Sequence, residues 1–377
     1  MWQVPLFKLN FDRREREAAC AVIDTGWLTM GEEVVAFEAD FAAYLGAPSV
    51  SCTAVSSGTA ALHLALLALG IGPGDEVIVP ALTFVADANV VAVAGAEPVL
   101  ADCAALDDWN VSADTLARRI TPRTRAMMVV HYAGFPCAMA AIRELCARHN
   151  LALIEDVAHA PGARIDGQAC GTFGDIACFS FFSNKNLSIG AGGMLATRDP
   201  ALHQQLRYLR SHGMTTLTLD RHHGRAVSYD VVRPGLNYRM DEIHAAIGRV
   251  QLDKLPAGNQ RRAELTALYR RLLAGTGVAI PFAALAGVEP SFHILPVLLP
   301  EGVDRLGVIA GLKACGVQSS IHYPPFWEFS AYRDRFSPDD APVAAAILPR
   351  QLTLPLYPTM AEADVEYVVA SLLDALR

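Results

Sequence analysis

The chain has 377 residues, a formal net charge of −8, and a composition that is 52% hydrophobic and 19% charged. This apolar content can offset the entropy of ordering the chain, so extended disorder is excluded. The length indicates a large domain with a smaller companion. The acidic balance argues against a surface for nucleic acid or anionic membranes, and it leaves open a small anionic ligand in a local basic pocket.

The termini and the cysteines predict a cytoplasmic protein. The first residues lack the basic and apolar regions of a secretory signal, and no stretch has the roughly 18 consecutive apolar residues of a membrane span. The eight cysteines include no CxxC pair for zinc or redox chemistry. We therefore expect reduced thiols, no bound metal and no membrane contact.

Helical and extended patterns alternate through the first two-thirds of the chain. Helices are expected over residues 59–69, 84–94, 113–120, 138–149 and about 200–211. Strands are expected over residues 75–79, 97–101, 125–131, 151–155, 175–181 and 193–197. Continuous apolar strands separated by helices predict an α/β protein with a mostly parallel sheet covered on both faces. In such proteins ligands bind along the carboxyl edge of the sheet.

The hydrophobic pattern changes in the last third of the chain. A helix over residues 241–255 is predicted to end a large domain, residues 1–255. Beyond it come a long helix that starts near Asn259, strands punctuated by proline near residues 277–299, and two further helices. We expect these elements to form a smaller α+β domain, residues 256–377.

Three short segments carry the residue types of a cofactor site, and each one ends a predicted strand or begins a predicted helix. The first is Ser56-Ser57-Gly58-Thr59, at the start of the helix over residues 59–69. Backbone N–H groups, hydroxyls and a glycine at a helix N-terminus can hold a phosphate. The same residue types also serve as ordinary helix caps.

The second segment ends the strand over residues 151–155 with two carboxylates, Glu155 and Asp156. A carboxylate at the tip of a central parallel strand points into the crevice where α/β proteins bind ligands, and a turn or capping aspartate is the structural alternative. The third segment places Lys185 between an aromatic run and a glycine-rich turn. Desolvation there would lower the pKa of the lysine and favour amine chemistry, whereas an exposed surface lysine is the alternative.

Together the three segments match what pyridoxal phosphate requires of a protein. In this interpretation the Lys185 amine forms a Schiff base with the cofactor, and the helix N-terminus holds the phosphate. The Asp156 carboxylate, 29 residues before the lysine, keeps the pyridine nitrogen protonated so that the ring can accept electrons.

Nine ordered segments resemble the DegT/DnrJ/EryC1/StrS aminotransferases, a fold-type-I family that uses pyridoxal phosphate and acts mainly on nucleotide-linked keto sugars. The resemblance covers nearly the whole chain. The segments are GWLTMG (26–31), FE (37–38), SGTAAL (57–62), PALTFVA (80–86), HYAG (131–134), EDVAHA (155–160), SFFSNKN (180–186), GLNYRM (235–240) and IHYP (321–324).

The resemblance implies a role for several individual residues. Lys185 would bind the cofactor and move protons, Asp156 would pair with the pyridine nitrogen, and His159 would lie beside the phenolic oxygen. Phe84 would stack on the ring. Asn237 would reach the phosphate in the neighbouring subunit, which implies a homodimer with shared active sites. Contacts with the phosphate of the same subunit are implied for Ser57, Gly58, Thr59 and Ser180.

Two further features bear on the substrate. Arg210 and His212 lie in a basic segment, residues 207–225, that also has arginines or histidines at positions 207, 221–223 and 225. The segment could meet a diphosphate or the carboxylate of an amino donor, and a solvated surface loop is the alternative. His322 and Tyr323 are expected to line a sugar pocket, or else to shape the turn before two prolines.

One departure from the family leaves the substrate open. Ala191 stands where relatives usually have glutamate or aspartate in the turn after the lysine. The change removes a charge near the site without removing the Schiff-base chemistry. The resemblance therefore does not distinguish a hexose from an aminocyclitol or a non-sugar ketone.

The leading hypothesis is a transaminase that takes an amino group from an amino acid, with L-glutamate as the expected donor, and passes it to a keto sugar. A sugar dehydratase of the same fold is the second hypothesis, although the related dehydratases replace the lysine with histidine and Lys185 is present here. A non-catalytic binding protein is the third. Such a protein would have no use for an intact lysine, aspartate and phosphate seat.

Overall fold

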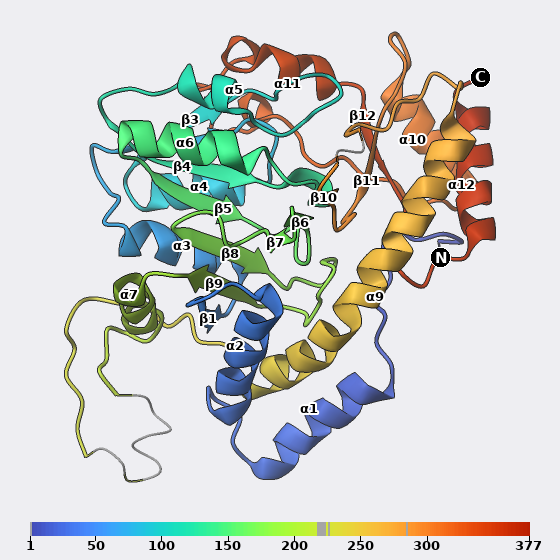
Figure 1. Ribbon diagram of the computed structural model, residues 1–377. Coiled ribbons are helices and arrows are strands. Elements are labelled where there is room, and N and C mark those ends of the chain that lie inside the picture. The colour runs from blue at the N-terminus through green and yellow to red at the C-terminus, as the bar shows by residue number, and fades with distance from the viewer. Residues whose placement is uncertain (1, 217–223, 225–226, 284–285) are drawn as a thin grey trace.

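The computed structural model describes residues 2–216, 224, 227–283 and 286–377. Its centre is a seven-stranded sheet with the strand order β1-β9-β8-β5-β4-β2-β3 (Figure 1). Only β9 of these seven strands runs opposite to the others, so the prediction of a mostly parallel sheet is confirmed. The strands are β1 (Ser51–Val55), β2 (Glu76–Pro80), β3 (Glu97–Ala101), β4 (Thr124–Val130), β5 (Ala152–Asp156), β8 (Ile176–Ser180) and β9 (Gly193–Thr197).

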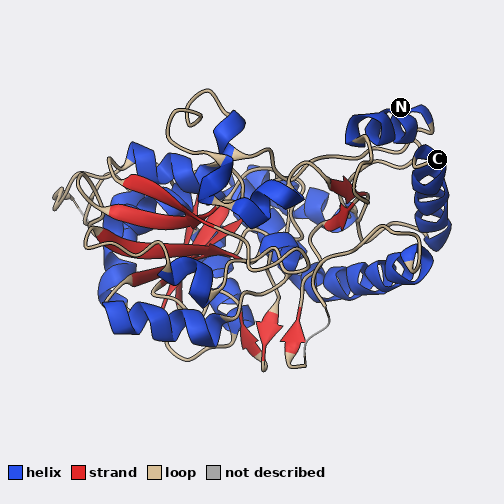
Figure 2. Cartoon of the chain, turned by 90° about the horizontal axis from the view of Figure 1, so that it is seen from above, coloured by secondary structure: helices blue, strands red, loops and turns tan. Residues whose placement is uncertain are grey.

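Helices cover both faces of this sheet (Figure 2). Alternate residues of β2 face opposite layers, because Val77 and Val79 pack in the cluster with α3 and α4 while Ile78 packs in the cluster with α6. Strands buried on both faces are apolar along their whole length, which explains the continuous runs in the sequence. The covering helices are α2 (Glu32–Leu45), α3 (Gly58–Ala68), α4 (Ala86–Val93), α5 (Ala113–Ala117), α6 (Met139–His149) and α7 (Pro200–Arg210).

The connections after β1, β2, β5 and β8 lie at one edge of the sheet, because these strands are parallel and their carboxyl ends point the same way. Two of these connections lead directly into helices. The chain passes from Val55 to Gly58 at the start of α3, and from Pro80 to Ala86 at the start of α4. Residues far apart in the sequence therefore meet at this edge.

One long helix, α9 (Glu242–Leu273), replaces the two helices expected on either side of residue 256. The prediction of two separate helices is wrong because Pro256 lies inside a continuous helix. Proline removes one backbone donor there, but apolar residues on both sides, such as Leu255 and Leu265, stay buried in packed clusters. The expected domain boundary falls within α9, and the division into two domains stays a prediction.

The second part of the molecule packs beside the C-terminal half of α9 and lies apart from the large sheet (Figure 2). Its buried cluster also includes Val4 from the N-terminal arm. The elements are α10 (Arg305–Ala314), α12 (Glu362–Ala375) and a two-stranded sheet of β11 (Leu295–Leu298) and β12 (Gln351–Leu354).

Several elements join the two parts of the molecule. β10 (Val288–Glu289) pairs with β6 (Arg164–Ile165), which in turn pairs with β7 (Gln168–Ala169). α11 (Pro342–Ile347) packs into the cluster that contains α3 and α4. α1 (Arg13–Thr25) lies along α9 (Figure 1). Three short 3₁₀ turns complete the described elements: Tyr132–Gly134, Phe326–Glu328 and Pro338–Asp340.

Within the described residues, no helix combines the length and apolar character that crossing a bilayer requires. All eight cysteines are free thiols. The described residues contain no group of three or more His, Cys, Asp or Glu side chains placed to hold a metal ion.

Candidate functional site

A cavity of about 290 Å³ opens at the carboxyl edge of the large sheet. Residues from both parts of the molecule line it. Its walls contain ten of the thirteen residues for which the sequence suggested a site role: Ser57, Gly58, Thr59, Phe84, Asp156, His159, Ser180, Lys185, His322 and Tyr323.

One wall of the cavity is the N-terminus of α3. Ser57 caps this helix, and its Oγ accepts a hydrogen bond of 3.0 Å from the backbone N–H of Ala60. A Cβ on Gly58 would lie only 2.7 Å from the Cβ of Ser180, so only glycine lets the backbone approach this closely. The free N–H groups of the first turn, the helix dipole and the hydroxyls of Thr59 and Ser180 form a seat for an anion such as phosphate.

The lysine and the aspartate are also part of the lining. Asp156 ends β5 with 7% of its surface exposed, and its Oδ1 accepts a hydrogen bond of 2.7 Å from the N–H of Ala158. Burial raises the pKa of Asp156, and the Ala158 bond and the Lys185 ammonium oppose that rise. Removal of the Lys185 ammonium from bulk water lowers its pKa to about 8, with Asp156 opposing that shift.

Glu155, the other carboxylate of the same strand, faces away from the cavity. Its oxygens accept hydrogen bonds from the N–H groups of Gly171, Phe173 and Gly174 at 2.7 to 2.9 Å, and His131 lies 3.2 Å away. Successive residues of a strand point to opposite faces, which separates the two neighbours. Glu155 thus holds a loop, and Asp156 alone serves the cavity.

The bonds of His159 define its tautomer. Its Nδ1 accepts the N–H of Ala133 at 3.3 Å, and its Nε2 lies 2.9 Å from the Oη of Tyr323. Burial, and then the charge of Lys185, hold the pKa of His159 well below its usual value, so the ring is neutral. A neutral ring that accepts at Nδ1 carries its proton on Nε2, and His159 therefore donates to Tyr323.

His322 and Tyr323 bring the second part of the molecule to the cavity. The backbone carbonyl of His322 accepts a hydrogen bond from the Tyr132 hydroxyl. The ring Nδ1 of His322 lies 2.9 Å from Thr353 Oγ1. Burial lowers the pKa of His322 to about 4, so this ring is also neutral. The Tyr323 ring lies 5.3 Å from the ring of Phe84, between centroids, and the two aromatic side chains flank the same space.

The structure does not bring three of the predicted residues to this cavity. Arg210 is 2% exposed, is paired with Glu38 of α2, and donates to the Ala54 carbonyl at 2.9 Å. A buried guanidinium needs such partners, which explains why the last turn of α7 points it inward. His212 and Asn237 are exposed and lie outside the cavity lining. The other basic residues suggested for this segment, at 221–223 and 225, lie outside the described residues.

Sequence reasoning missed three polar residues at or behind the cavity. Asn184 lines it, and its Oδ1 is buried without a hydrogen-bond partner among the described residues. Thr83 also lines it and donates from Oγ1 to Oδ2 of Asp87 at 2.5 Å. Asp87 is 1% exposed. A carboxylate inside the mostly apolar helix Ala86–Val93 was the signal in the sequence that could have marked this pair.

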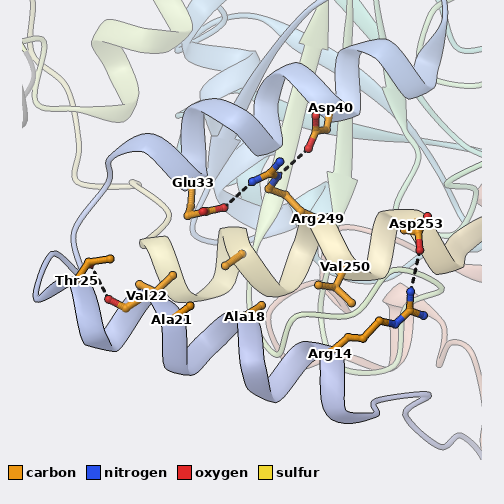
Figure 3. Close-up of a pocket in the computed structure, with 11 residues that line it drawn as sticks. Arg14, Ala18, Ala21, Val22, Thr25, Glu33, Asp40, Arg249, Val250 and Asp253 are labelled. Atoms are coloured by element: carbon orange, nitrogen blue, oxygen red, sulfur yellow. Dashed lines mark hydrogen bonds and ion pairs between the residues drawn. The ribbon is translucent and has the colours of Figure 1, made fainter.

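A second hollow, of about 470 Å³, lies between α1, α2 and α9 (Figure 3). Small residues such as Ala18 form its floor. Arg249 bridges Glu33 at 2.9 Å and Asp40 at 2.7 Å, and Arg14 meets Asp253 at 2.9 Å. The lining charges of this groove are therefore all matched by neighbours.

Comparison with known proteins gives a consistent result. The model of the DegT/DnrJ/EryC1/StrS aminotransferase family matches residues 10–373. The chain is 36% identical to the aminotransferase TlmJ from Streptoalloteichus hindustanus, with a TM-score of 0.90, covering 100% of this chain and 99% of that chain. It is 35% identical to DesV from S. venezuelae, solved in complex with a ketimine intermediate, with a TM-score of 0.91 and 100% of both chains covered.

A more distant match shows the cofactor in another relative. Spr1654 from Streptococcus pneumoniae, assigned as a sugar aminotransferase, is 28% identical and has a TM-score of 0.91, covering 100% of this chain and 98% of that chain. It has been solved in its pyridoxamine phosphate (PMP) form.

Proposed function

The chain belongs to the DegT/DnrJ/EryC1/StrS aminotransferase family and is a pyridoxal-phosphate-dependent aminotransferase, and we propose that it moves an amino group from L-glutamate to a nucleotide-linked keto sugar. One observation carries the proposal: Lys185, Asp156 and the N-terminus of α3 line the same cavity. The assignment of Spr1654 as a sugar aminotransferase supports a sugar as the acceptor.

The residues of the cavity fit pyridoxal phosphate. The close approach of Gly58 to Ser180 leaves no room for a side chain, so backbone N–H groups are free to hold a phosphate. Asp156 offers a carboxylate to a protonated ring nitrogen, and neutral His159 offers polar contacts to the ring substituents. When bound, the cofactor supplies an electron sink for the charge left by proton removal.

We propose that Lys185 is the proton carrier of the reaction. With a pKa of about 8, about one tenth of its amine is unprotonated at pH 7, far more than for a lysine in water. The Nζ can therefore take a proton from the α-carbon of the amino acid and release it again, as general acid–base catalysis requires. The cavity walls hold this amine away from bulk water, which limits competing proton exchange.

We propose that His322, Tyr323 and Phe84 contact the acceptor. The Tyr323 hydroxyl oxygen accepts a hydrogen bond from His159 Nε2–H, so its own O–H can be donated to another acceptor, such as a sugar oxygen. Phe84 is 52% exposed at the cavity mouth, and its ring offers an apolar face to a sugar or to the cofactor.

We also propose a homodimer in which the subunits share their active sites. Asn237 is exposed and does not line the cavity of its own subunit, which fits a contact with the cofactor phosphate of a partner. Phe182, on the cavity rim, leaves 55% of its surface exposed, and a partner could cover it. Weaker cofactor binding by Asn237→Ala would support the shared site, and unchanged affinity would contradict it.

A transfer assay tests the proposed reaction. The enzyme is incubated with ¹⁵N-labelled L-glutamate and, in parallel, with a nucleotide-linked keto sugar, a keto cyclitol or a simple ketone. We expect labelled amino sugar and 2-oxoglutarate with the first acceptor, and no product with Lys185→Ala. If ¹⁵N appeared only in the product of the cyclitol or the simple ketone, the assignment of a sugar acceptor would be overturned. A dehydrated product without ¹⁵N would overturn the assignment as a transaminase.

A further inference from the structure

A second carboxyl group lies directly behind Asp156, outside the lining of the cavity. Asp87 stands in the first turn of α4 and is 1% exposed. Its Oδ2 accepts the Thr83 hydroxyl, and its Oδ1 has no hydrogen-bond partner among the described residues when the group is treated as ionised. Thr83, which donates to Asp87, lines the same cavity as Asp156, and each of the two carboxyl groups changes the pKa of the other.

Two ionised carboxylates in this position would be unstable. Both would be acceptors only, both would be removed from water, and their like charges would repel. A single proton removes the conflict, because a protonated Oδ1 of Asp87 becomes a donor and the neighbouring Asp156 is an acceptor. A proton on Asp87 Oδ1 therefore gives this atom a hydrogen-bond partner and also removes the repulsion between the two carboxylates.

The surroundings decide which carboxyl group keeps the proton. Asp156 is favoured as the anion, because it accepts the N–H of Ala158 at 2.7 Å and lies near the Lys185 ammonium. Asp87 has one neutral donor, the Thr83 hydroxyl. Burial and the charge of Asp156 raise the pKa of Asp87 well above its usual value, in agreement with this order.

We propose that Asp87 stays protonated at neutral pH and donates a hydrogen bond from Oδ1 to the carboxylate of Asp156, which holds that carboxylate ionised and oriented. Asp87 is then a positioning residue that acts through Asp156. Its effect on the cofactor rests on the proposed function, in which Asp156 meets the ring nitrogen. The location of the proton does not depend on that function.

The other groups that face Asp87 are compatible with this assignment. The Lys185 ammonium favours an ionised Asp87, but Asp156 is ionised before Asp87 and balances that charge. Burial raises the pKa of both Cys178 and Tyr323, so these groups stay neutral. His131 acts on Asp156 from the end of β4 and favours its ionised form. The N-terminus of α4 also favours an anion at Asp87, but a helix end does not compensate for a second buried like charge.

Infrared difference spectra of the cofactor-free, full-length protein locate the proton directly. We expect the carbonyl band of a protonated carboxylic acid in the wild type at pH 7, and we expect Asp87→Asn to lack it. Asp12→Asn is the matched control, because the pKa of exposed Asp12 is lowered to about 2 and its replacement removes only an ionised carboxylate. Identical acid bands in the wild type and in Asp87→Asn would overturn the proposal.

A pair of substitutions tests the hydrogen bond itself. Asparagine at position 87 keeps the shape and the donor, so we expect Asp87→Asn to bind pyridoxal phosphate within about twofold of the wild type. Asp87→Leu keeps the volume without a donor, and we expect about tenfold weaker binding, the size of one lost hydrogen bond to a charged group. Equal losses in both variants would overturn the positioning role, because they would mean that Asp87 acts as an anion.

The same two variants separate this proposal from the proposed function. The absorption of the bound cofactor should change with pH at a higher pH in Asp87→Leu than in the wild type and in Asp87→Asn, because Asp156 without its donor is a stronger base and holds the proton of the ring nitrogen more tightly. Thr83→Val should shift the pH of this absorption change in the same direction as Asp87→Leu does, by a smaller amount. A protein that fails to transaminate but shows the acid band would contradict the proposed function alone.

Discussion

The cavity at the sheet edge and the groove between α1, α2 and α9 are two hollows that differ in how their polar groups are satisfied. In the groove between α1, α2 and α9, the lining charges meet opposite charges within 3 Å, and small apolar side chains form the floor. In the cavity at the sheet edge, a buried oxygen of Asn184 has no hydrogen-bond partner in the described part of the chain, and Lys185 has a lowered pKa. The groove, although larger, is a completed packing interface, whereas the smaller cavity has polar groups available to a ligand.

The origin of the difference lies in the connections that build each hollow. The groove is formed by helices that pack side by side, and its ion pairs join neighbouring helices across exposed surface. The cavity is formed where parallel strands end, so its polar groups come from several loops and cannot all pair with one another. The predictions that follow test this contrast, in order of expected effect.

Replacing Lys185 removes the proposed base and the amine that binds the cofactor. We expect Lys185→Ala to lower transamination by at least about 10⁴-fold, the upper range for a positioned acid–base group. The folded state should persist, because the Asp156 carboxylate left behind still accepts the N–H of Ala158 and its buried position favours uptake of a proton. Amino transfer at the wild-type rate, measured with labelled glutamate, would remove Lys185 from the mechanism.

Asp156→Asn tests the carboxylate of the same cavity. The amide cannot hold a protonated ring nitrogen as an ion pair, so we expect kcat to fall by about 10²- to 10³-fold, the size of a lost electrostatic contact at a reacting centre. The far-ultraviolet circular dichroism spectrum should not change. An activity within twofold of the wild type would show that the ring nitrogen does not depend on Asp156.

The pH dependence of cofactor loading tests the state of Lys185. Its pKa is lowered to about 8, and only the unprotonated amine can attack the cofactor aldehyde. The loading rate of the cofactor-free enzyme should therefore rise about tenfold per pH unit below that pKa and level off above it. Stopped-flow absorbance would measure it, and a rate independent of pH would contradict the lowered pKa.

Gly58→Ala tests the anion seat. The new Cβ would lie 2.7 Å from Ser180, so we expect about tenfold weaker binding of pyridoxal phosphate, corresponding to about 1.4 kcal/mol. Gly72→Ala is the matched control, because its Cβ would meet only the Ala94 carbonyl at an ordinary 3.7 Å. Equal affinities for the two variants would show that the N-terminus of α3 does not hold the phosphate.

The smallest effect is expected in the groove. Arg249→Met removes both ion pairs of a side chain that is 41% exposed, so the free energy of unfolding should fall by no more than about 1 kcal/mol. Transamination should not change. A loss of activity comparable to that of the cavity variants would break the contrast between the two hollows and show that the groove takes part in function.

The sequence predicted the residues of the site better than the helices and strands that surround it. The β5 and β9 strands were placed within one residue of their observed bounds, because continuous apolar runs end at polar residues there. Lys185 and Asp156 were identified because each follows a buried strand. Helices α1 and α2 and strand β1 were not predicted, and two helices were wrongly expected where α9 is continuous.

Pair contacts across the fold could not be predicted from one chain. Arg210 was expected near a substrate because of its basic neighbours, but its partner Glu38 lies 172 residues earlier and takes it into the interior. Asp87 was missed for the same reason, since it lies in α4 and its significance depends on Asp156, which ends the distant strand β5. Local patterns indicate elements and their ends, and long-range packing decides which side chains meet.

The central claim is that the cavity at the sheet edge holds pyridoxal phosphate on Lys185. Borohydride reduction of the purified holoenzyme fixes the cofactor to its lysine, and peptide mapping by mass spectrometry then locates it. We predict the added mass on the peptide that contains Lys185, and its absence after prior exposure to L-glutamate, which converts the cofactor to a form detached from the protein. The same mass on another lysine, or on none, would contradict the claim.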